Sequence, residues 1–192
     1  MKNSMRHLDL TEWVWCGDDM MEPKAGSAIE PAIIEAYRES EYRVLANNDG
    51  ANAGNTSKTS DTNNANLYGQ LPFVLRIGQP SATLRALQHK VGVDSSVFLT
   101  ACNPFSQIID DRGNAIRMQA LMDELARIDS NRGGLSVLAG MGKHPVNDWP
   151  GETSVLAIGL DLDCAVALGQ RFQQNAIVWC DTHAMPVLVL LR

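Results

Sequence analysis

Glu152 is the residue whose setting in the sequence best suits acid–base chemistry. It follows the rigid turn formed by Trp149, Pro150 and Gly151 and stands just before a predicted strand. Its carboxyl group would therefore be held in a fixed position, and a positioned carboxyl group can donate or accept a proton in a reaction. Glu152 is a candidate general acid or base; the alternative is a solvated turn residue.

Asn103 is a second candidate, because it follows a predicted buried strand and precedes Pro104. A residue before proline is biased to an extended backbone, which would leave the Asn103 amide free to hydrogen-bond outward. Such an amide can orient a substrate or stabilise an oxyanion. The alternative is an Asn-Pro turn in which Phe105 fills the core.

Two further segments carry polar groups. Gln174 and Asn175 lie where the last predicted long helix gives way to a strand, and they either cap that helix or face a ligand. Gly142 and Lys143 resemble part of a phosphate-binding loop, but the upstream glycine is missing and His144 replaces the required serine or threonine. This segment is therefore not a Walker motif, and no G-x-S-x-G, H-E-x-x-H or G-x-G-x-x-G motif occurs elsewhere.

No metal site or cofactor is predicted. Asp181 and His183 could ligate a metal, but no third ligand stands near them in the sequence. The cysteines include no C-x-x-C pair and are expected to be free, buried thiols: Cys16, Cys102, Cys164 and Cys180.

Composition excludes several classes of protein. The 192 residues carry a net charge of −6, which argues against broad binding to nucleic acid or to an anionic membrane. The longest apolar stretches, such as residues 186–191, are too short to span a bilayer. The first ten residues lack the apolar core of a signal peptide, so a cytoplasmic location is expected.

The chain is expected to form one domain over residues 27–192, preceded by an N-terminal segment, residues 1–26. Residues 46–69 consist almost entirely of Asn, Ser, Thr, Gly, Asp and Ala, a composition typical of a disordered insertion. We expect residues 47–66 to be dispensable for stability, because they can bury little apolar surface.

Hydrophobic periodicity predicts the remaining elements. Residues 27–30 have the form of a capping box at the start of a helix, and Ser81 is expected to cap a second helix that ends at Gly92. Two longer helices are predicted over residues 114–128 and, capped by Asp161 or Asp163, up to Phe172. Strands are predicted over residues 42–45, 73–77, 97–101, 135–139, 154–160, 176–180 and 187–191.

In order, residues 97–180 give the pattern β-α-β-β-α-β. This pattern predicts an α+β fold with a split β-α-β (ferredoxin-like) core, in which helices pack on a single sheet and extra hairpin strands extend it. The residues expected in the core are Leu121, Leu125, Phe172, Val178 and Leu188.

Several of these segments together resemble the bacterial domain-of-unknown-function family 3293. They are FVLRIG with Gln79, FLTACNPFSQ, the helix start at Asn114, WPGE, FQQNAIVW and the closing VLVLLR. The resemblance covers residues 30–192 apart from the Asn-rich insertion. It implies a small cytoplasmic bacterial protein and a shared site, without naming a reaction. The family's elements fall on Asn103, Pro104, Asn114, Arg117, Trp149, Gly151, Glu152, Gln174 and Asn175.

Two functions are compatible with these residues. The first is a module that binds a small polar ligand or a protein partner, with a homodimer through an edge strand such as residues 186–192. The second is a hydrolase-type enzyme that uses Glu152 as general acid or base and Asn103 as the orienting or oxyanion-stabilising group. In either case we expect the polar groups to converge on one face, with Arg117 paired to Glu152. The converging residues are Asn103, Arg117, Glu152 and Gln174.

Overall fold

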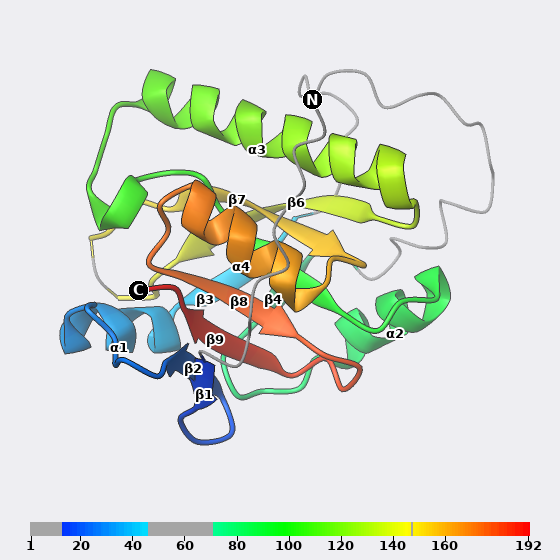
Figure 1. The fold of residues 1–192 in the computed structure, drawn as a ribbon, viewed down its shortest axis with the longest axis horizontal. Helices are drawn as coiled ribbons and strands as arrows, with labels where there is room; N and C mark the ends of the chain where they lie inside the picture. The colour runs from blue at the N-terminus through cyan, green and yellow to red at the C-terminus, as the bar shows by residue number, and fades with distance from the viewer. Residues whose placement is uncertain (1–12, 46–70, 147) are drawn as a thin grey trace.

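The computed structural model describes residues 13–45, 71–146 and 148–192 (Figure 1). The predicted insertion, residues 46–69, lies outside the described residues. The segment expected to be dispensable for stability, residues 47–66, lies outside them as well. Within the described ranges, the chain forms an α+β fold with one open, mixed sheet of nine strands and four α-helices.

The strands follow the sheet order β1-β2-β9-β8-β5-β7-β6-β3-β4. Their bounds are β1 Trp13–Trp15, β2 Met20–Pro23, β3 Glu41–Val44, β4 Phe73–Leu75, β5 Ser96–Leu99, β6 Ser136–Lys143, β7 Glu152–Ile158, β8 Ala176–Cys180 and β9 Pro186–Leu190. The helices are α1 Pro31–Glu39, α2 Ala82–Val91, α3 Asp111–Arg132 and α4 Leu162–Arg171, and a short 3-10 helix spans Pro104–Ser106. All neighbouring strands pair antiparallel except β2 and β9, which are parallel.

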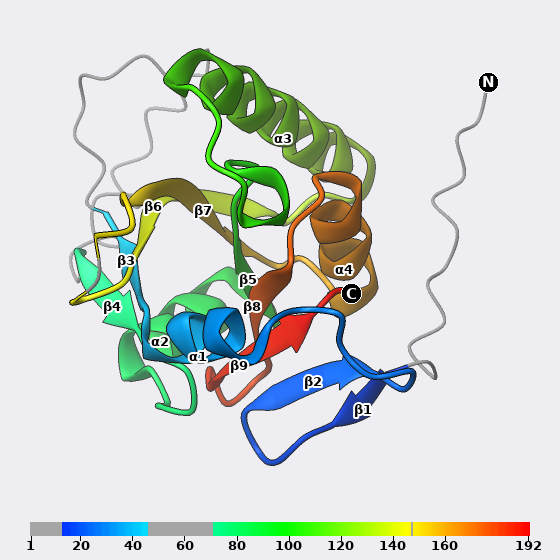
Figure 2. The same cartoon turned by 90° about the vertical axis from the view of Figure 1, so that its left-hand side faces the viewer.

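The sheet lies between two layers of helices. Helices α3 and α4 cover one face, and α1 and α2 cover the other (Figures 1 and 2). Each face has its own apolar core: Leu121 and Leu125 of α3 pack on the first, and Leu84 and Leu87 of α2 on the second. The five predicted core residues are all buried, with Val178 and Leu188 in the second core.

Of the predicted helix caps, those of α2 and α4 are present in the structure and that of α1 is not. Ser81 caps α2 by accepting a hydrogen bond from the Leu84 N–H, and Gly92 ends it in a left-handed conformation, as predicted. Asp161 likewise caps α4. The predicted capping box at residues 27–30 is wrong: α1 begins at Pro31, and Ser27 instead accepts a hydrogen bond from the Ile29 N–H.

Helix α3 is longer than predicted, because Asp110 caps it by accepting a hydrogen bond from the Gly113 N–H. Asn114 is consequently in the first turn of the helix rather than at its start. Strand β6 is also longer than predicted. Gly140, Gly142 and Lys143 lie within it, so the segment that resembled a phosphate-binding loop is part of the sheet.

Two strands near the N-terminus extend the sheet beyond the elements that the periodicity predicted. Strand β2 pairs with β9, which also pairs with β8, so β9 lies inside the sheet. The expectation that the closing strand lies at an edge is therefore wrong; the edge strands in the described part of the sheet are β1 and β4. No helix formed by the described residues is long and apolar enough to cross a membrane.

Candidate functional site

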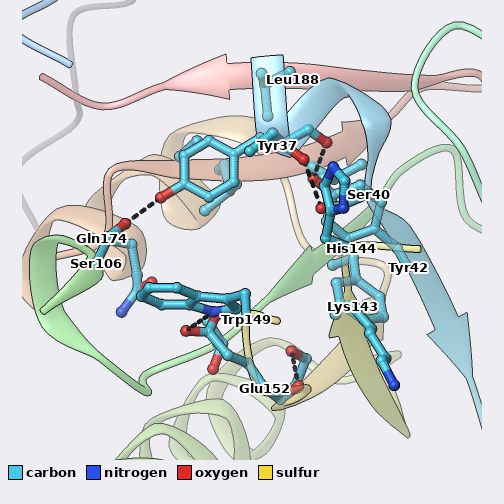
Figure 3. Close-up of a pocket in the computed structure, with 18 of the residues that line it drawn as sticks. Tyr37, Ser40, Tyr42, Ser106, Lys143, His144, Trp149, Glu152, Gln174 and Leu188 are labelled. Carbon is cyan, nitrogen blue, oxygen red and sulfur yellow. Dashed lines mark hydrogen bonds between the residues drawn. The ribbon is translucent and has the colours of Figure 1, made fainter. Parts of the chain in front are cut away.

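A cavity of about 290 Å³ lies between α1 and the face of the sheet that α1 covers (Figure 3). Helix α1 contributes Ile33 and Tyr37 to its wall, and strands β3 and β5 to β9 contribute the opposite side. Many of the lining side chains are apolar. One group of polar side chains lies where the loops after β5 and before β7 meet, and a second consists of Ser40, Lys143 and His144. The apolar side chains from the sheet include Tyr42, Phe98, Leu99, Val178 and Leu188.

Gly142 leaves space in the middle of the cavity wall. In the register of the sheet, Gly142 lies between Tyr42 on β3 and Glu152 on β7. A Cβ atom added to Gly142 would meet nothing closer than Ser154 Oγ at 3.8 Å. A side chain at this position would therefore extend into the cavity, so the glycine keeps the space between Tyr42 and Glu152 open.

The Glu152 carboxyl group is the acidic group on the cavity wall. Asn103 Nδ2 and Trp149 Nε1 both donate hydrogen bonds to its Oε1 atom, at 2.7 and 3.2 Å. Oε2 accepts no hydrogen bond from any described residue. Burial raises the pKa of Glu152, while the two hydrogen bonds act in the opposite direction. One carboxylate oxygen is thus fixed by the protein, and the other is left for a ligand.

Asn103 acts on Glu152, and a network behind it fixes its own orientation. Its backbone N–H donates to Asn114 Oδ1 at 2.9 Å, and Asn114 Nδ2 donates to Asn103 Oδ1 at 3.1 Å. The backbone N–H of Ile109 donates to the same Oδ1 atom. The predicted extended backbone is wrong: Asn103 has a φ of 45°, in the left-handed region. This conformation directs the side chain inward to Glu152.

Arg117 does not pair with Glu152, contrary to the prediction. Its Nε atom donates to the Ala101 carbonyl oxygen at 2.6 Å, and its Nη2 atom donates to the Phe172 carbonyl oxygen. Arg117 lies on α3, on the other side of the loops that border the cavity, and it joins the loop after β5 to the loop after α4. Its role in the structure is to hold these two loops together.

Gln174 strengthens the same connection and also lines the cavity. Its Nε2 atom donates to the Cys102 carbonyl oxygen at 2.9 Å. The backbone N–H of Phe105 donates to the Gln173 carbonyl oxygen at 2.7 Å. Phe105, Ser106 and Gln173 all have positive φ angles, so the junction of the loops concentrates backbone strain.

Asn175 belongs to a hydrogen-bonded group that the sequence did not reveal. Its Nδ2 atom donates to Ser106 Oγ at 2.9 Å and to the Tyr37 hydroxyl at 3.3 Å. The Tyr37 and Ser106 hydroxyl groups are 2.6 Å apart (Figure 3). This group joins α1 to the loops, and burial raises the pKa of Tyr37. No local signal in the sequence predicts the partner of the Tyr37 hydroxyl group.

Of the four residues expected to converge, Asn103, Glu152 and Gln174 line the cavity and Arg117 does not. Trp149 lines the cavity beside them. Arg117, Asn114 and Asn175 support these residues from behind. A Cβ atom at Gly151 would be 2.9 Å from Met141 Sδ, so its lack of a side chain permits a close contact. The alternative in which Phe105 fills the core is wrong, because the ring is 37 % exposed and lies under the Arg192 guanidinium group.

Asp181 and His183, the pair for which no metal site was predicted, lie in a turn. The backbone N–H of His183 donates to Asp181 Oδ1 at 2.9 Å. Among the described residues there is no group of three side chains that could hold a metal ion. His144, by contrast, lines the cavity and lies 3.0 Å from the Glu39 carboxylate, a contact that the sequence did not predict.

Residues 99–177 match the model of a family described as protein of unknown function (DUF3293). The matched segment is less than half of the chain, but it contains the whole network around Glu152. Residues 99–177 are therefore similar to this family. No curated protein and no solved structure matches the chain.

The matched segment supplies only part of the cavity. It extends from the end of β5 to the start of β8 and contributes Asn103, Glu152 and Gln174. The residues of α1 and β3 that complete the cavity, including Tyr37 and Tyr42, lie outside it. The cavity therefore combines the matched segment with elements that precede it and, through Val178 and Leu188, with strands that extend beyond it.

Proposed function

We propose that the protein binds a small molecule in the cavity between α1 and the sheet, with Glu152 as its main polar contact. This proposal depends on the hydrogen bonding of the Glu152 carboxyl group. Oε1 accepts hydrogen bonds from Asn103 and Trp149, and Oε2 accepts none from the described residues. Ligand sites in proteins are concave and largely apolar, with a few fixed polar groups that orient the ligand. The cavity has these features.

The supporting network favours a binding function. Asn114 fixes Asn103, and Asn103 fixes Glu152, so the acceptor is preorganised before a ligand arrives. A preorganised site loses less conformational entropy on binding. Strained residues in the adjacent loops also support a functional role, since strain tends to collect at ligand-binding sites.

Native mass spectrometry of the purified protein and an NMR screen of small molecules test this proposal. We expect ligands to bind the wild type and to be lost in Gly142→Leu, whose side chain fills the cavity. Ala139→Leu is the matched control, because Ala139 is exposed on the opposite side of β6. If no small molecule distinguishes Gly142→Leu from the wild type and Ala139→Leu, the proposal is wrong.

A hydrolase-type enzyme that uses Glu152 as general acid or base is the second candidate. The raised pKa of Glu152 favours it, because a carboxyl group that holds its proton closer to neutral pH is a better proton donor and acceptor. Asn103 would then position Glu152, since its amide is already engaged with Glu152 and Asn114. In an enzyme, Glu152→Gln would abolish turnover of a ligand that still binds.

We also propose that β5 to β8, with α3 and α4, form a ferredoxin-like core. The order β8-β5-β7-β6 of these antiparallel strands, and the position of both connecting helices on one face, support this arrangement. A cytoplasmic location, binding to a protein partner and a homodimer through an edge strand stay predictions from the sequence.

A further inference from the structure

Four of the hydroxyl groups on the cavity wall have no hydrogen left to donate, whereas Tyr37 and Ser106 share one hydrogen bond and keep one hydrogen between them. Each of four hydroxyls donates its single hydrogen to a backbone carbonyl oxygen, so it presents only lone pairs to a ligand. The four bonds are Ser40 Oγ to Ala36, Tyr42 OH to Tyr37, Thr100 Oγ1 to Thr153 and Ser154 Oγ to Glu152, at 2.6 to 2.9 Å.

Three of the N–H donors on the wall are engaged as well. Trp149 Nε1 and Asn103 Nδ2 donate to Glu152 Oε1, and Gln174 Nε2 donates to the carbonyl oxygens of Cys102 and Phe172. Around the Glu152 carboxyl group the wall therefore offers more acceptors than donors, although the second hydrogen of Asn103 Nδ2 and the Lys143 ammonium group form no hydrogen bond with another described residue. A complementary ligand must therefore bring donors of its own.

Glu152 adds a negative charge to this set of acceptors. No arginine, lysine or histidine of the described residues forms an ion pair with its carboxylate. Lys143 lines the cavity, but its side chain points away from the Glu152 carboxylate (Figure 3). His144 is beside Glu39 instead. A partly buried carboxylate without a cation is costly, and a cationic ligand would offset that cost.

The aromatic side chains favour the same kind of ligand. Tyr37, Tyr42 and Trp149 line the cavity around the carboxyl group (Figure 3). The faces of tyrosine and tryptophan rings attract cations. The rest of the wall, including Phe98, Val178 and Leu188, is apolar and suits a hydrocarbon body.

We propose that the natural ligand is an amine that is protonated when bound: its ammonium group donates a hydrogen bond to Glu152 Oε2, and its apolar body packs on Phe98, Val178 and Leu188. This inference rests on the proposed function, since it names the ligand class of the same cavity. It goes beyond that proposal because it fixes the charge and the hydrogen-bonding character of the ligand.

Three probes of nearly the same shape test the ligand class: 2-phenylethylamine, 2-phenylethanol and phenylacetate, which are cationic, neutral and anionic. Each is titrated into the full-length protein, and the chemical shifts of backbone amides around Gly142 and Glu152 are followed by NMR. We expect the amine to bind at least about tenfold more tightly than the alcohol, a difference typical of one good ionic contact, and phenylacetate to bind most weakly.

Two variants assign the preference to Glu152. Glu152→Gln keeps the size of the side chain and removes the charge, so it should bring the affinity for the amine down to that for the alcohol. Glu35→Gln is the matched control, because it removes the same charge from an exposed side chain on α1. It should leave all three affinities unchanged, whereas a general effect of the net charge of −6 would weaken amine binding equally in both variants.

The remaining outcomes separate this inference from the proposed function. If the alcohol or phenylacetate shifts the same amides as strongly as the amine does, the amine proposal is overturned while the binding site stands. The amine proposal is also overturned if the amine binds Glu152→Gln as tightly as the wild type. If none of the three probes affects residues around the cavity, the amine proposal is wrong. The proposed function is wrong as well if the small-molecule screen finds no ligand that binds the wild type and not Gly142→Leu.

Discussion

Asn103 Nδ2 donates a 2.7 Å hydrogen bond to Glu152 Oε1 across 49 residues of sequence. The bond joins the loop after β5 to the first residue of β7. It also determines which oxygen of the carboxyl group is available, because Oε1 is engaged and Oε2 is left for the cavity. The orientation of the candidate ligand-binding group therefore depends on a residue that is itself held in a left-handed conformation.

Replacement of Asn103 should cost stability through two separate effects. Asn103→Ala loses the side-chain bonds to Glu152, Asn114 and the Ile109 N–H. It also places alanine in the left-handed region, so we expect the free energy of unfolding to fall by about 3 kcal/mol. Asn103→Gly loses the same bonds without the strain and should lose about 1 kcal/mol less. Urea denaturation measures both. Equal losses would show that the backbone conformation contributes nothing.

Asn114 should act as a positioning residue. Asn114→Ala removes two hydrogen bonds to Asn103, so we expect a loss of about 1–2 kcal/mol in the free energy of unfolding and a weaker affinity for any ligand of Glu152. Gln119→Ala is the control, because Gln119 is on the same helix and bonds only the exposed Asp123 side chain. An Asn114→Ala protein with unchanged stability and unchanged ligand affinity would contradict this role.

The helices and strands with strong local signals could be predicted from the sequence. The caps of α2 and α4 depend only on neighbouring residues: Ser81 and Gly92 for α2, and Asp161 for α4. The spacing of apolar residues in α3 likewise indicates which face of the helix is buried. These features need no knowledge of the distant parts of the chain. The same applies to the hairpins β3–β4 and β8–β9, whose strands follow one another in sequence.

The site could be predicted only in part, because it depends on contacts between distant residues. Local turn chemistry indicated Glu152, Asn103 and Gln174 as unusual, but nothing local shows that Arg117 bonds backbone carbonyl oxygens instead of Glu152. The left-handed conformation of Asn103 likewise arises from its bonds to Asn114 and Glu152, which override the preference of a residue before proline. Tertiary contacts decide each of these features.

Arg117 should be important for the loops that border the cavity. Arg117→Met keeps much of the side chain's apolar part but loses both bonds to carbonyl oxygens, so we expect a loss of about 3 kcal/mol in the free energy of unfolding. We also expect faster hydrogen exchange of the Phe105 amide, which bonds across the same two loops. Arg112→Met, on the exposed surface of α3, is the control. Unchanged exchange at Phe105 would show that Arg117 does not hold the loops together.

Leu121 tests the core under α3. Its side chain is fully buried, so Leu121→Ala should lower the free energy of unfolding by about 2–5 kcal/mol through lost apolar burial and the cavity left behind. Ile116→Ala removes apolar volume from a side chain on the same helix that is 62 % exposed, and it should cost less than about 1 kcal/mol. Denaturant unfolding compares the two. Similar losses would contradict the assigned faces of the helix.

The pH dependence of stability tests the environment of Glu152. Burial raises the pKa of Glu152 above its ordinary value of 4.5, so the folded state holds this proton more tightly than the unfolded state. The stabilising contribution of the protonated group is complete below pH 4.5 and is lost as pH rises through the raised pKa. Glu152→Gln cannot titrate. Its free energy of unfolding relative to the wild type should therefore increase over this window and stay constant above it.

The size of that increase is about 1.4 kcal/mol for each unit that separates the two pKa values. The charged and titratable groups that face Glu152 from other elements, or lie on the cavity wall, are kept in the variant: Tyr37, Tyr42, Cys102, Lys143 and His144. The difference between variant and wild type therefore isolates the carboxyl group. Urea unfolding at closely spaced pH values measures it, and Glu35→Gln, at an exposed side chain on α1, is the control. A difference that decreases with rising pH would mean that hydrogen bonds outweigh burial and that Glu152 is a stabilised carboxylate.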